Sequence, residues 1–394
     1  MRILLSHNHY QQSGGEDRVF ASEADLLQSR GHRVLRYTAH NDRVPEKGRL
    51  ALASGTVWNP TVYGELRDLI RAEKPDVAHF HNTFPLISPA AYHACRAEGV
   101  PVVQTLHNYR LICANALLFR DGKVCEDCLG RRLAWPGVVH ACYRESRPAS
   151  GAVAAMLYAH RALGTWAKTV DRYVALTEFA RRKFVEGGLP PEKISVKPNF
   201  VHPDPGLGSG GGYALYAGRL SVEKGLGTIL AAWGRIGDRM PLKVVGSGPL
   251  EHLASESAGR APGVQWLGQR SSNEVRALMR GAAFLVFPSE CYENLPTTII
   301  EAFACGTPVV ASERGAAGEL VEDGRTGRLF PAGDAAALAA LVARVARDPE
   351  GLYRMRREAR KEFEARYTAD RSYGALLEIY RSVRWPTSSA VRLS

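Results

Sequence analysis

Residues 287–308 read FPSECYENLPTTIIEAFACGTP, and this stretch is the most informative in the sequence. Pro296 suits the first position of a helix and Gly306 suits its C-terminal cap, so a helix is predicted between them. The loop before such a helix points free backbone N–H groups outward, which favours binding of phosphate or of sugar hydroxyls. The stretch therefore predicts a ligand site in front of a short helix.

Two glutamates accompany this helix. Glu293 lies in the loop, and Glu301 lies about a turn and a half inside the helix. The pair can hold two separate hydroxyl-bearing parts of one ligand. Taken alone it would be weak evidence, because isolated glutamates are more often solvent-exposed charge.

The pattern around this stretch is a regular alternation of short β-branched runs with longer helical runs, which is typical of a parallel sheet covered by helices. We expect helices over 14–27, 150–169, 353–367 and 373–384. The expected strands cover 2–6, 33–37, 76–81, 101–107, 171–176, 213–218, 242–246, 264–267, 283–288 and 308–312. The fold class is therefore α/β, with two Rossmann-like domains.

The domain boundary falls where a proline-rich run passes into a glycine-rich one, at residues 198–212. We expect an N-terminal domain over 1–197 and a C-terminal domain over 213–369. A final helix within about 370–394 is expected to pack back on the N-terminal domain.

The formal net charge of +11 favours anionic partners such as nucleotides, phospholipid head groups or nucleic acid. No zinc-finger spacing, RNP-like aromatic strand or lysine-rich tail supports nucleic acid. The start of the chain lacks a signal-peptide core, and no segment has the apolar length of a spanning helix, so we expect a cytoplasmic protein. The 150–169 helix has two interpretations, a core-facing helix, which we favour, or a peripheral contact with the inner face of a membrane.

The segment from Glu293 to Val310, with its small-residue helix and following Gly-x-Pro, resembles the E-x7-E signature of the retaining GT-B glycosyltransferases of family four. The resemblance implies two Rossmann-like domains facing each other across a cleft, with the donor on the C-terminal domain and the acceptor on the N-terminal one. It implies transfer of a sugar from a nucleotide diphosphate-sugar, with retained anomeric configuration, in glycan, glycolipid or glycoconjugate biosynthesis. No D-x-D metal clamp accompanies the donor motifs, so no catalytic metal is expected.

The same resemblance extends to Gly218-Arg219 and Lys224-Gly225, which match the family's G-R-x4-K-G segment. It assigns Arg219 and Lys224 to the diphosphate, where two fixed cations can stabilise the charge of a departing leaving group. Together with Glu293 and His107 they form the predicted catalytic set. The other residues assigned to the donor are Gly14, Gly15, Gly218, Gly246, Gly248, Leu267, Asn294, Leu295 and Glu301.

Two of these assignments lie in the N-terminal half. Ser13-Gly14-Gly15 resembles the glycine loop that closes over the donor phosphate, although the next residues, Glu16 and Asp17, depart from the family and could contact the acceptor instead. His107 resembles the active-site histidine near the transferred sugar, with Asn108 in place of the usual aspartate. By itself His107 is more often a hydrogen-bonded core residue.

The sequence has three rival interpretations. A dinucleotide-binding fingerprint at Gly246-Ser247-Gly248 lacks the third glycine and the acidic residue further on. A nucleotide-sugar epimerase of the same fold and a non-catalytic polyanion-binding protein remain alternatives to the transferase.

Four of the seven cysteines fall in one segment of the N-terminal half. Cys125 and Cys128 form a C-x2-C knuckle flanked by Cys113 and Cys142, a spacing that predicts a structural zinc site, with His140 as an alternative to Cys142. Buried thiols or a redox-active pair remain the other interpretations.

Overall fold

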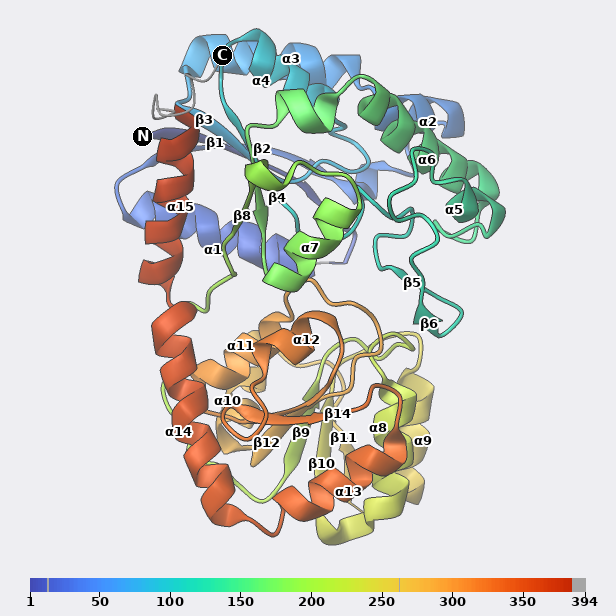
Figure 1. The fold of residues 1–394 in the computed structure, drawn as a ribbon, viewed down its shortest axis with the longest axis vertical. Helices are drawn as coiled ribbons and strands as arrows, with labels where there is room; N and C mark the ends of the chain where they lie inside the picture. Colours follow the sequence, from blue (N-terminus) through green and yellow to red (C-terminus); the bar gives the residue numbers. More distant parts are fainter. Residues whose placement is uncertain (13, 262, 385–394) are drawn as a thin grey trace, which may run out of the picture. The chain divides into compact units, whose positions relative to one another are not determined.

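The computed structural model describes residues 1–12, 14–261 and 263–384. The chain forms two compact units (Figure 1). The first contains residues up to Leu117, Glu126–Pro198 and the chain from Ser372 onward, and the second contains Leu118–Cys125 and Asn199–Arg371. From Asn199 onward, the segment predicted as a linker belongs to the second unit.

The first unit is built on a six-stranded parallel sheet with the order β2-β1-β3-β4-β7-β8. Its strands are β1 (Arg2–His9), β2 (Arg33–His40), β3 (Val77–Asn82), β4 (Val102–Thr105), β7 (Arg172–Ala175) and β8 (Ile194–Val196). Every residue of β3 and β4 is buried, as expected for strands that are covered on both faces.

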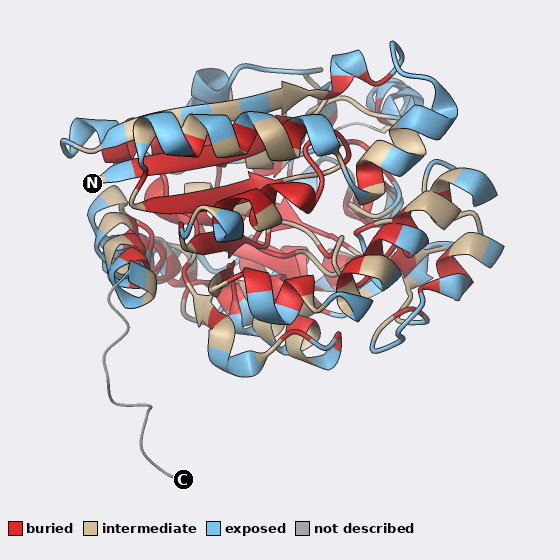
Figure 2. Cartoon of the chain, turned by 90° about the horizontal axis from the view of Figure 1, so that it is seen from above, coloured by how far each residue is buried: buried red, intermediate tan, exposed pale blue. Residues whose placement is uncertain are grey.

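The helices of this unit are α1 (Gly15–Ser29), α2 (Arg49–Val57), α3 (Pro60–Glu73), α4 (Ala90–Ala97), α5 (Trp135–Val139), α6 (Arg147–Ala162), α7 (Glu178–Glu186) and α15 (Ala369–Arg384), whose first three residues fall in the other unit. Figure 2 shows helices that are buried on the side toward a sheet and exposed on the other. Leu376 and Tyr380 of α15 pack into the same apolar cluster as Ile3 and Val77. The last helix therefore completes the core of the first unit.

The second unit holds another six-stranded parallel sheet, with the order β11-β10-β9-β12-β13-β14. Its strands are β9 (Ala214–Ala217), β10 (Leu242–Val245), β11 (Val264–Trp266), β12 (Phe284–Phe287), β13 (Val309–Ser312) and β14 (Gly327–Phe330). Its helices are α8 (Leu226–Ile236), α9 (Glu251–Arg260), α10 (Ser272–Gly281), α11 (Thr297–Ala304), α12 (Gly315–Leu320), α13 (Ala335–Val345) and α14 (Pro349–Arg366). The hairpin of β5 (Phe119–Arg120) and β6 (Lys123–Val124) is also grouped with this unit.

The helix predicted within residues 287–308 forms as α11, which begins one residue later than predicted. Pro296 is the residue that caps the N-terminus, and the helix begins at Thr297. Gly306 has a φ of +65°, and its N–H bonds the carbonyl of Phe303 at 2.9 Å, which ends the helix.

One helix prediction was wrong. The expected continuous helix over 150–169 is interrupted, because α6 ends at Ala162 and Gly164 has a φ of +69° before a separate π-helical turn over Thr165–Thr169. Met156 and Leu157 are buried, whereas Tyr158 is half exposed. The apolar face of α6 therefore packs mainly inward, as the favoured interpretation expected.

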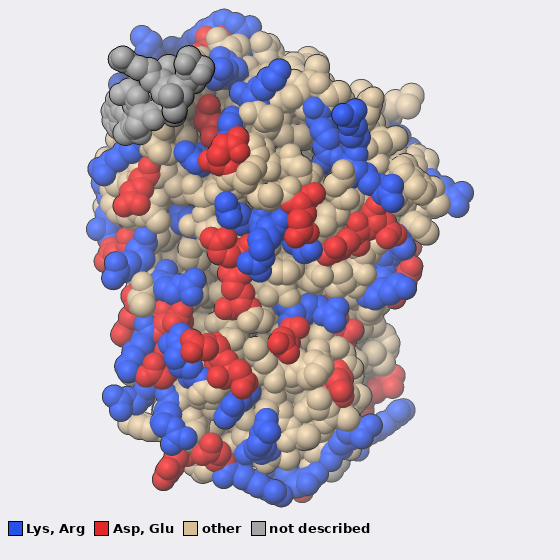
Figure 3. Space-filling model, in the orientation of Figure 1, with Lys and Arg blue, Asp and Glu red and all other residues tan. Residues whose placement is uncertain are grey.

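No helix in the described ranges combines the length and the apolar character that crossing a membrane requires. On the face in Figure 3, Lys and Arg side chains interleave with Asp and Glu. On that face, the excess positive charge is spread over the surface.

Candidate active site

The strand order of the six-stranded sheet in the second unit reverses between β9, the first strand of that sheet in the sequence, and β12, the fourth. In open parallel sheets, ligands bind outside the carboxyl ends of the strands at such a reversal. The loop after β9 carries Gly218 and Arg219, and the loop after β12 carries Glu293. The topology thus places both donor motifs at the expected ligand position.

The structure brings Lys224 and Glu293 into direct contact. Lys224 Nζ donates to Glu293 Oε1 at 2.6 Å, and Ser289 Oγ donates to the same oxygen at 2.8 Å. Burial alone would lower the pKa of Lys224, but the Glu293 carboxylate raises it above the usual value. The lysine is therefore a fixed cation, and its side chain is still 30% exposed and able to meet a ligand.

Arg219 is exposed and makes no ion pair with any described residue. Its own carbonyl accepts a 2.8 Å hydrogen bond from the Tyr216 hydroxyl, which fixes the backbone of this loop. Arg219 thus has a fixed backbone and a guanidinium that is not paired with a carboxylate, which suits the binding of an anion.

The glycines of this region allow three loops to pack without space for a side chain. A Cβ atom on Gly246, whose φ is +138°, would lie 1.9 Å from the carbonyl oxygen of Gly218. One on Gly248 would lie 2.5 Å from the oxygen of Leu220, and one on Gly225 would lie 1.9 Å from the oxygen of Pro288. The loops after β9, β10 and β12 therefore meet backbone to backbone.

The other C-terminal residues that the sequence assigned to the nucleotide-sugar lie on loops that follow strands of this sheet and on α11. Gly246 N donates to the Gly268 carbonyl at 2.9 Å, next to half-buried Leu267. Asn294 and Leu295 are buried in the loop before α11, and Glu301 is half buried within α11. All predicted residues of the C-terminal half thus lie on the loops and the helix at the carboxyl edge of one sheet.

The first unit has its own reversal, between β1 and β3. Gly14 lies after β1 and caps α1, and its N–H donates to Asp17 Oδ2 at 2.6 Å, while Gly15 is exposed. Ser13 lies outside the described residues. The glycine turn is therefore tied to the first turn of α1 by a carboxylate.

Asp17 is buried and also binds two histidines. Its Oδ1 lies 2.9 Å from His7 Nε2 and 3.1 Å from His9 Nδ1. Burial alone would raise the pKa of Asp17, but the hydrogen bond with His7 lowers it to about 2. The Asp17 carboxylate therefore has its hydrogen-bond partners within the protein.

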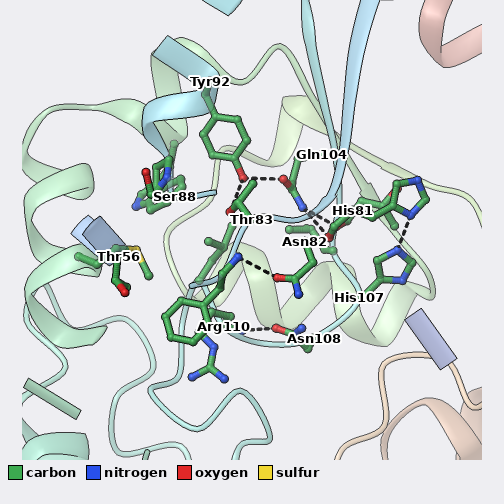
Figure 4. A pocket seen from close by; sticks show the side chains of 17 residues that line it. Thr56, His81, Asn82, Thr83, Ser88, Tyr92, Gln104, His107, Asn108 and Arg110 are labelled. Atoms are coloured by element: carbon green, nitrogen blue, oxygen red, sulfur yellow. Dashed lines mark hydrogen bonds between the residues drawn. The ribbon is translucent and has the colours of Figure 1, made fainter. Parts of the chain in front are cut away.

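His107 lies two residues beyond β4, where it contacts a histidine that sequence reasoning missed. Its Nε2 lies 2.9 Å from Nδ1 of His81 (Figure 4). Burial lowers the pKa of His81 to about 4 and the pKa of His107 well below its usual value. Both rings are therefore neutral at physiological pH.

Glu23 of α1 lies beside His81, at the ring nitrogen that faces away from His107. Its Oε1 lies 3.2 Å from His81 Nε2 and 3.1 Å from His79 Nδ1, and its Oε2 lies 3.2 Å from Lys197 Nζ. Burial alone would raise the pKa of Glu23, but Lys197 and the histidines hold it well below the usual value. The Glu23 carboxylate lies beside Nε2 of His81 without a hydrogen bond of good geometry, and its negative charge favours a proton on that nitrogen. In that tautomer, His81 Nδ1 accepts from His107. The Nδ1 atom of His107 is then left as an acceptor for a ligand.

A pocket opens beside His107 in the first unit. Asn82, Thr83, Gln104 and Arg110 contribute polar groups to it (Figure 4). Its other lining residues are Thr56, His81, Phe84, Ser88, Pro89, Tyr92, Thr105, Leu106, Asn108, Leu111, Met156 and Trp166. The mixed polar and apolar lining suits a small hydroxylated molecule.

The predicted zinc site has four cysteines, Cys113, Cys125, Cys128 and Cys142. In the described ranges, the clusters of three potential metal ligands are His7 with His9 and Asp17, and Glu23 with His79 and His81. Neither includes a cysteine, and the second already has the Lys197 ammonium on its carboxylate. Cys113 Sγ instead donates to Asn115 Oδ1 at 2.9 Å. Zinc binding stays a prediction that elemental analysis would test.

Comparison with protein families matches both halves of the chain. The model described as Glycosyltransferase Family 4 matches residues 13–205, and the model described as Glycosyl transferases group 1 matches residues 211–348. The second match contains Arg219, Lys224, Glu293 and Glu301.

Curated relatives include a phosphatidyl-myo-inositol mannosyltransferase of Mycobacterium leprae, 34% identical over 47% of this chain and 53% of the relative. The matching segment thus spans about half the length of that relative. A protein of the same name from Mycolicibacterium smegmatis is 26% identical over 89% of this chain and 86% of its own length.

Among solved structures, Anabaena HepE in complex with UDP is similar over 97% of this chain and 100% of its own, with a TM-score of 0.69 and 19% identity. At that identity the likeness concerns the fold, which is the two-domain GT-B fold. With both halves matched by glycosyltransferase models, and with the motif residues gathered at the carboxyl edge of the second sheet, the chain belongs to the group 1 glycosyltransferases of family four.

Proposed function

We propose that this protein transfers a sugar from a nucleotide diphosphate-sugar to a hydroxylated acceptor, with retention of the anomeric configuration. The observation that carries the proposal is the contact between Lys224 and Glu293 at the β9/β12 reversal, with Arg219 close by in sequence. Cations at this position suit a diphosphate, and a carboxylate suits sugar hydroxyls.

In this reaction, the bond between the anomeric carbon and the diphosphate oxygen breaks, and the nucleoside diphosphate leaves with the electron pair. Arg219 and Lys224 stabilise the negative charge that gathers on the leaving group. Glu293 holds hydroxyls of the transferred sugar, and Glu301 holds a second hydroxyl-bearing part of the donor. The acceptor oxygen bonds to the anomeric carbon on the face that the diphosphate leaves, and its proton passes to the departing phosphate.

The pocket beside His107 holds the acceptor in this proposal. The unprotonated Nδ1 of His107 accepts a hydrogen bond from a substrate hydroxyl. Relatives named as mannosyltransferases and a fold relative bound to UDP support a nucleotide-sugar donor. The corresponding biosynthetic product is a glycan or a glycolipid.

The test is a panel of UDP-, GDP- and ADP-sugars with the purified protein, scored for release of nucleoside diphosphate. Slow hydrolysis of one donor is expected even without an acceptor, because water can replace the acceptor hydroxyl. An isomerised donor without release would identify an epimerase, and tight binding without any turnover would identify a binding protein; either result contradicts the proposal.

A further inference from the structure

The pocket beside His107 contains one permanent charge. Of its lining residues, Arg110 is the one whose side chain is charged at neutral pH, because His81 and His107 have lowered pKa values. We infer that Arg110 binds an oxyanion, a phosphoryl or carboxyl group, on the acceptor. This inference rests on the proposed transfer reaction and names the class of its acceptor.

Two aromatic rings hold the Arg110 guanidinium in place. Its central carbon lies 4.5 Å from the centre of the Phe84 ring and 4.9 Å from that of Tyr143. Its Nη1 donates to the carbonyl oxygen of Ala114, and its backbone N–H donates to Asn108 Oδ1 at 3.0 Å. A guanidinium fixed in this way loses little freedom when a ligand binds, and its remaining N–H groups form a fork suited to an oxyanion.

The charge of Arg110 is not neutralised by the protein. No described carboxylate forms an ion pair with it, and burial lowers its pKa. The nearby Glu16 is engaged by Asn108 Nδ2 at 2.7 Å and by the Tyr10 hydroxyl at 3.0 Å, and burial raises the pKa of Glu16. A poorly hydrated cation of this kind gains more from an incoming anion than an exposed arginine does.

Other polar groups of the pocket have hydrogen-bond partners within the protein. The Tyr92 hydroxyl donates to Gln104 Oε1 at 2.5 Å, and Asn82 Nδ2 donates to the carbonyl of Asn8 at 2.8 Å. These side chains are uncharged, so Arg110 is the group in the pocket that can bind an anion by charge. The acceptor is therefore a hydroxyl compound that carries an anionic group, such as a sugar phosphate or a sugar acid.

The test uses the full-length protein labelled with ¹⁵N at arginine side chains, and follows the Nε–H signals by NMR during titration with inorganic phosphate, sodium acetate and methyl α-D-glucoside. The Arg110 signal is identified by its loss in Arg110→Gln. Arg144→Gln is the matched control, because Arg144 stacks 5.5 Å from the same Tyr143 ring but is exposed.

We expect a saturable shift of the Arg110 signal with an anion in the millimolar range, preserved in Arg144→Gln, and none with the neutral glucoside. A response to phosphate alone indicates a phosphoryl acceptor, and a response to acetate alone a carboxyl acceptor. No saturable shift with either anion, or an equal shift with the glucoside, overturns the inference. Nucleoside diphosphate release from the donor panel is measured separately, so failure of the transfer reaction is recognised independently.

Discussion

At the residue scale, the site depends on buried histidines that the sequence could only partly indicate. His107 was predicted from a family motif, whereas His81 and Glu23 were not. Alternation in a strand puts His79 and His81 on the same side of β3, which was a usable signal. The approach of Glu23 from α1 could not be predicted, because no spacing rule links a helix turn to a strand more than fifty residues away.

The neutral histidines make folding stability depend on pH. The pKa of His81 is about 4 in the folded protein and 6.5 as the reference, so the unfolded chain binds more protons between these values. Neutral His81 contributes fully to the free energy of unfolding above pH 6.5, and this contribution is lost as the pH falls toward 4. At about 1.36 kcal/mol per pKa unit, the loss is about 3 kcal/mol. Urea unfolding across this range should show a steeper loss for the wild type than for His81→Gln. Equal slopes would count against the neutral His81–His107 pair.

At the element scale, most strands could be predicted from periodicity, and the errors have local causes. β8 and β14 were not predicted, because these edge strands are only partly buried and lack the continuous apolar run of the central strands. The interrupted helix after α6 was missed because the apolar spacing continues through Gly164, whose φ of +69° ends it. The motif helix α11 was predicted well because Pro and Gly mark both of its ends.

The close packing of loops at the donor site predicts a contrast between two glycines. Gly246→Ala should lower the free energy of unfolding by roughly 1–3 kcal/mol and raise the KM for the donor, because its Cβ would meet the Gly218 carbonyl. Gly234→Ala, inside α8 with nothing within 4 Å of a new Cβ, should raise stability by about 0.5–1 kcal/mol. The free energy of unfolding from urea curves and the KM for the donor test this contrast. A Gly246→Ala protein with wild-type stability and KM would show that a Cβ atom fits between the loops, against the prediction.

At the scale of the whole molecule, two α/β domains with parallel sheets were expected, and each half forms a parallel sheet with one more strand than the five predicted. Each sheet has its reversal where the motif residues lie. The C-terminal motif residues could be located from the sequence, because each lies at the end of a predicted strand or in a loop or helix that follows one. The pocket beside His107 could not be predicted, because its lining residues come from segments far apart in the sequence, and the sequence does not show that these segments meet.

The proposed same-face attack has a stereochemical consequence for the overall reaction. The new linkage should keep the α or β configuration of the donor. The coupling constant of the anomeric proton in the isolated product, measured by NMR, reports this directly. An inverted linkage would mean that the acceptor attacks from the opposite face, and the retaining mechanism would then be abandoned.

The central claim is that Arg219, Lys224 and Glu293 act on the donor, and the most direct measurement is nucleoside diphosphate release by three variants whose fold is checked by circular dichroism. Arg219→Ala, Lys224→Ala and Glu293→Gln should each lower the rate by about 10²–10³ with unchanged spectra, since each removes a group that stabilises or positions the reacting donor. Matched controls in the same unit, which should keep wild-type rates, are Arg235→Ala, Lys243→Ala and Glu256→Gln. Near wild-type release in all three site variants would contradict the account.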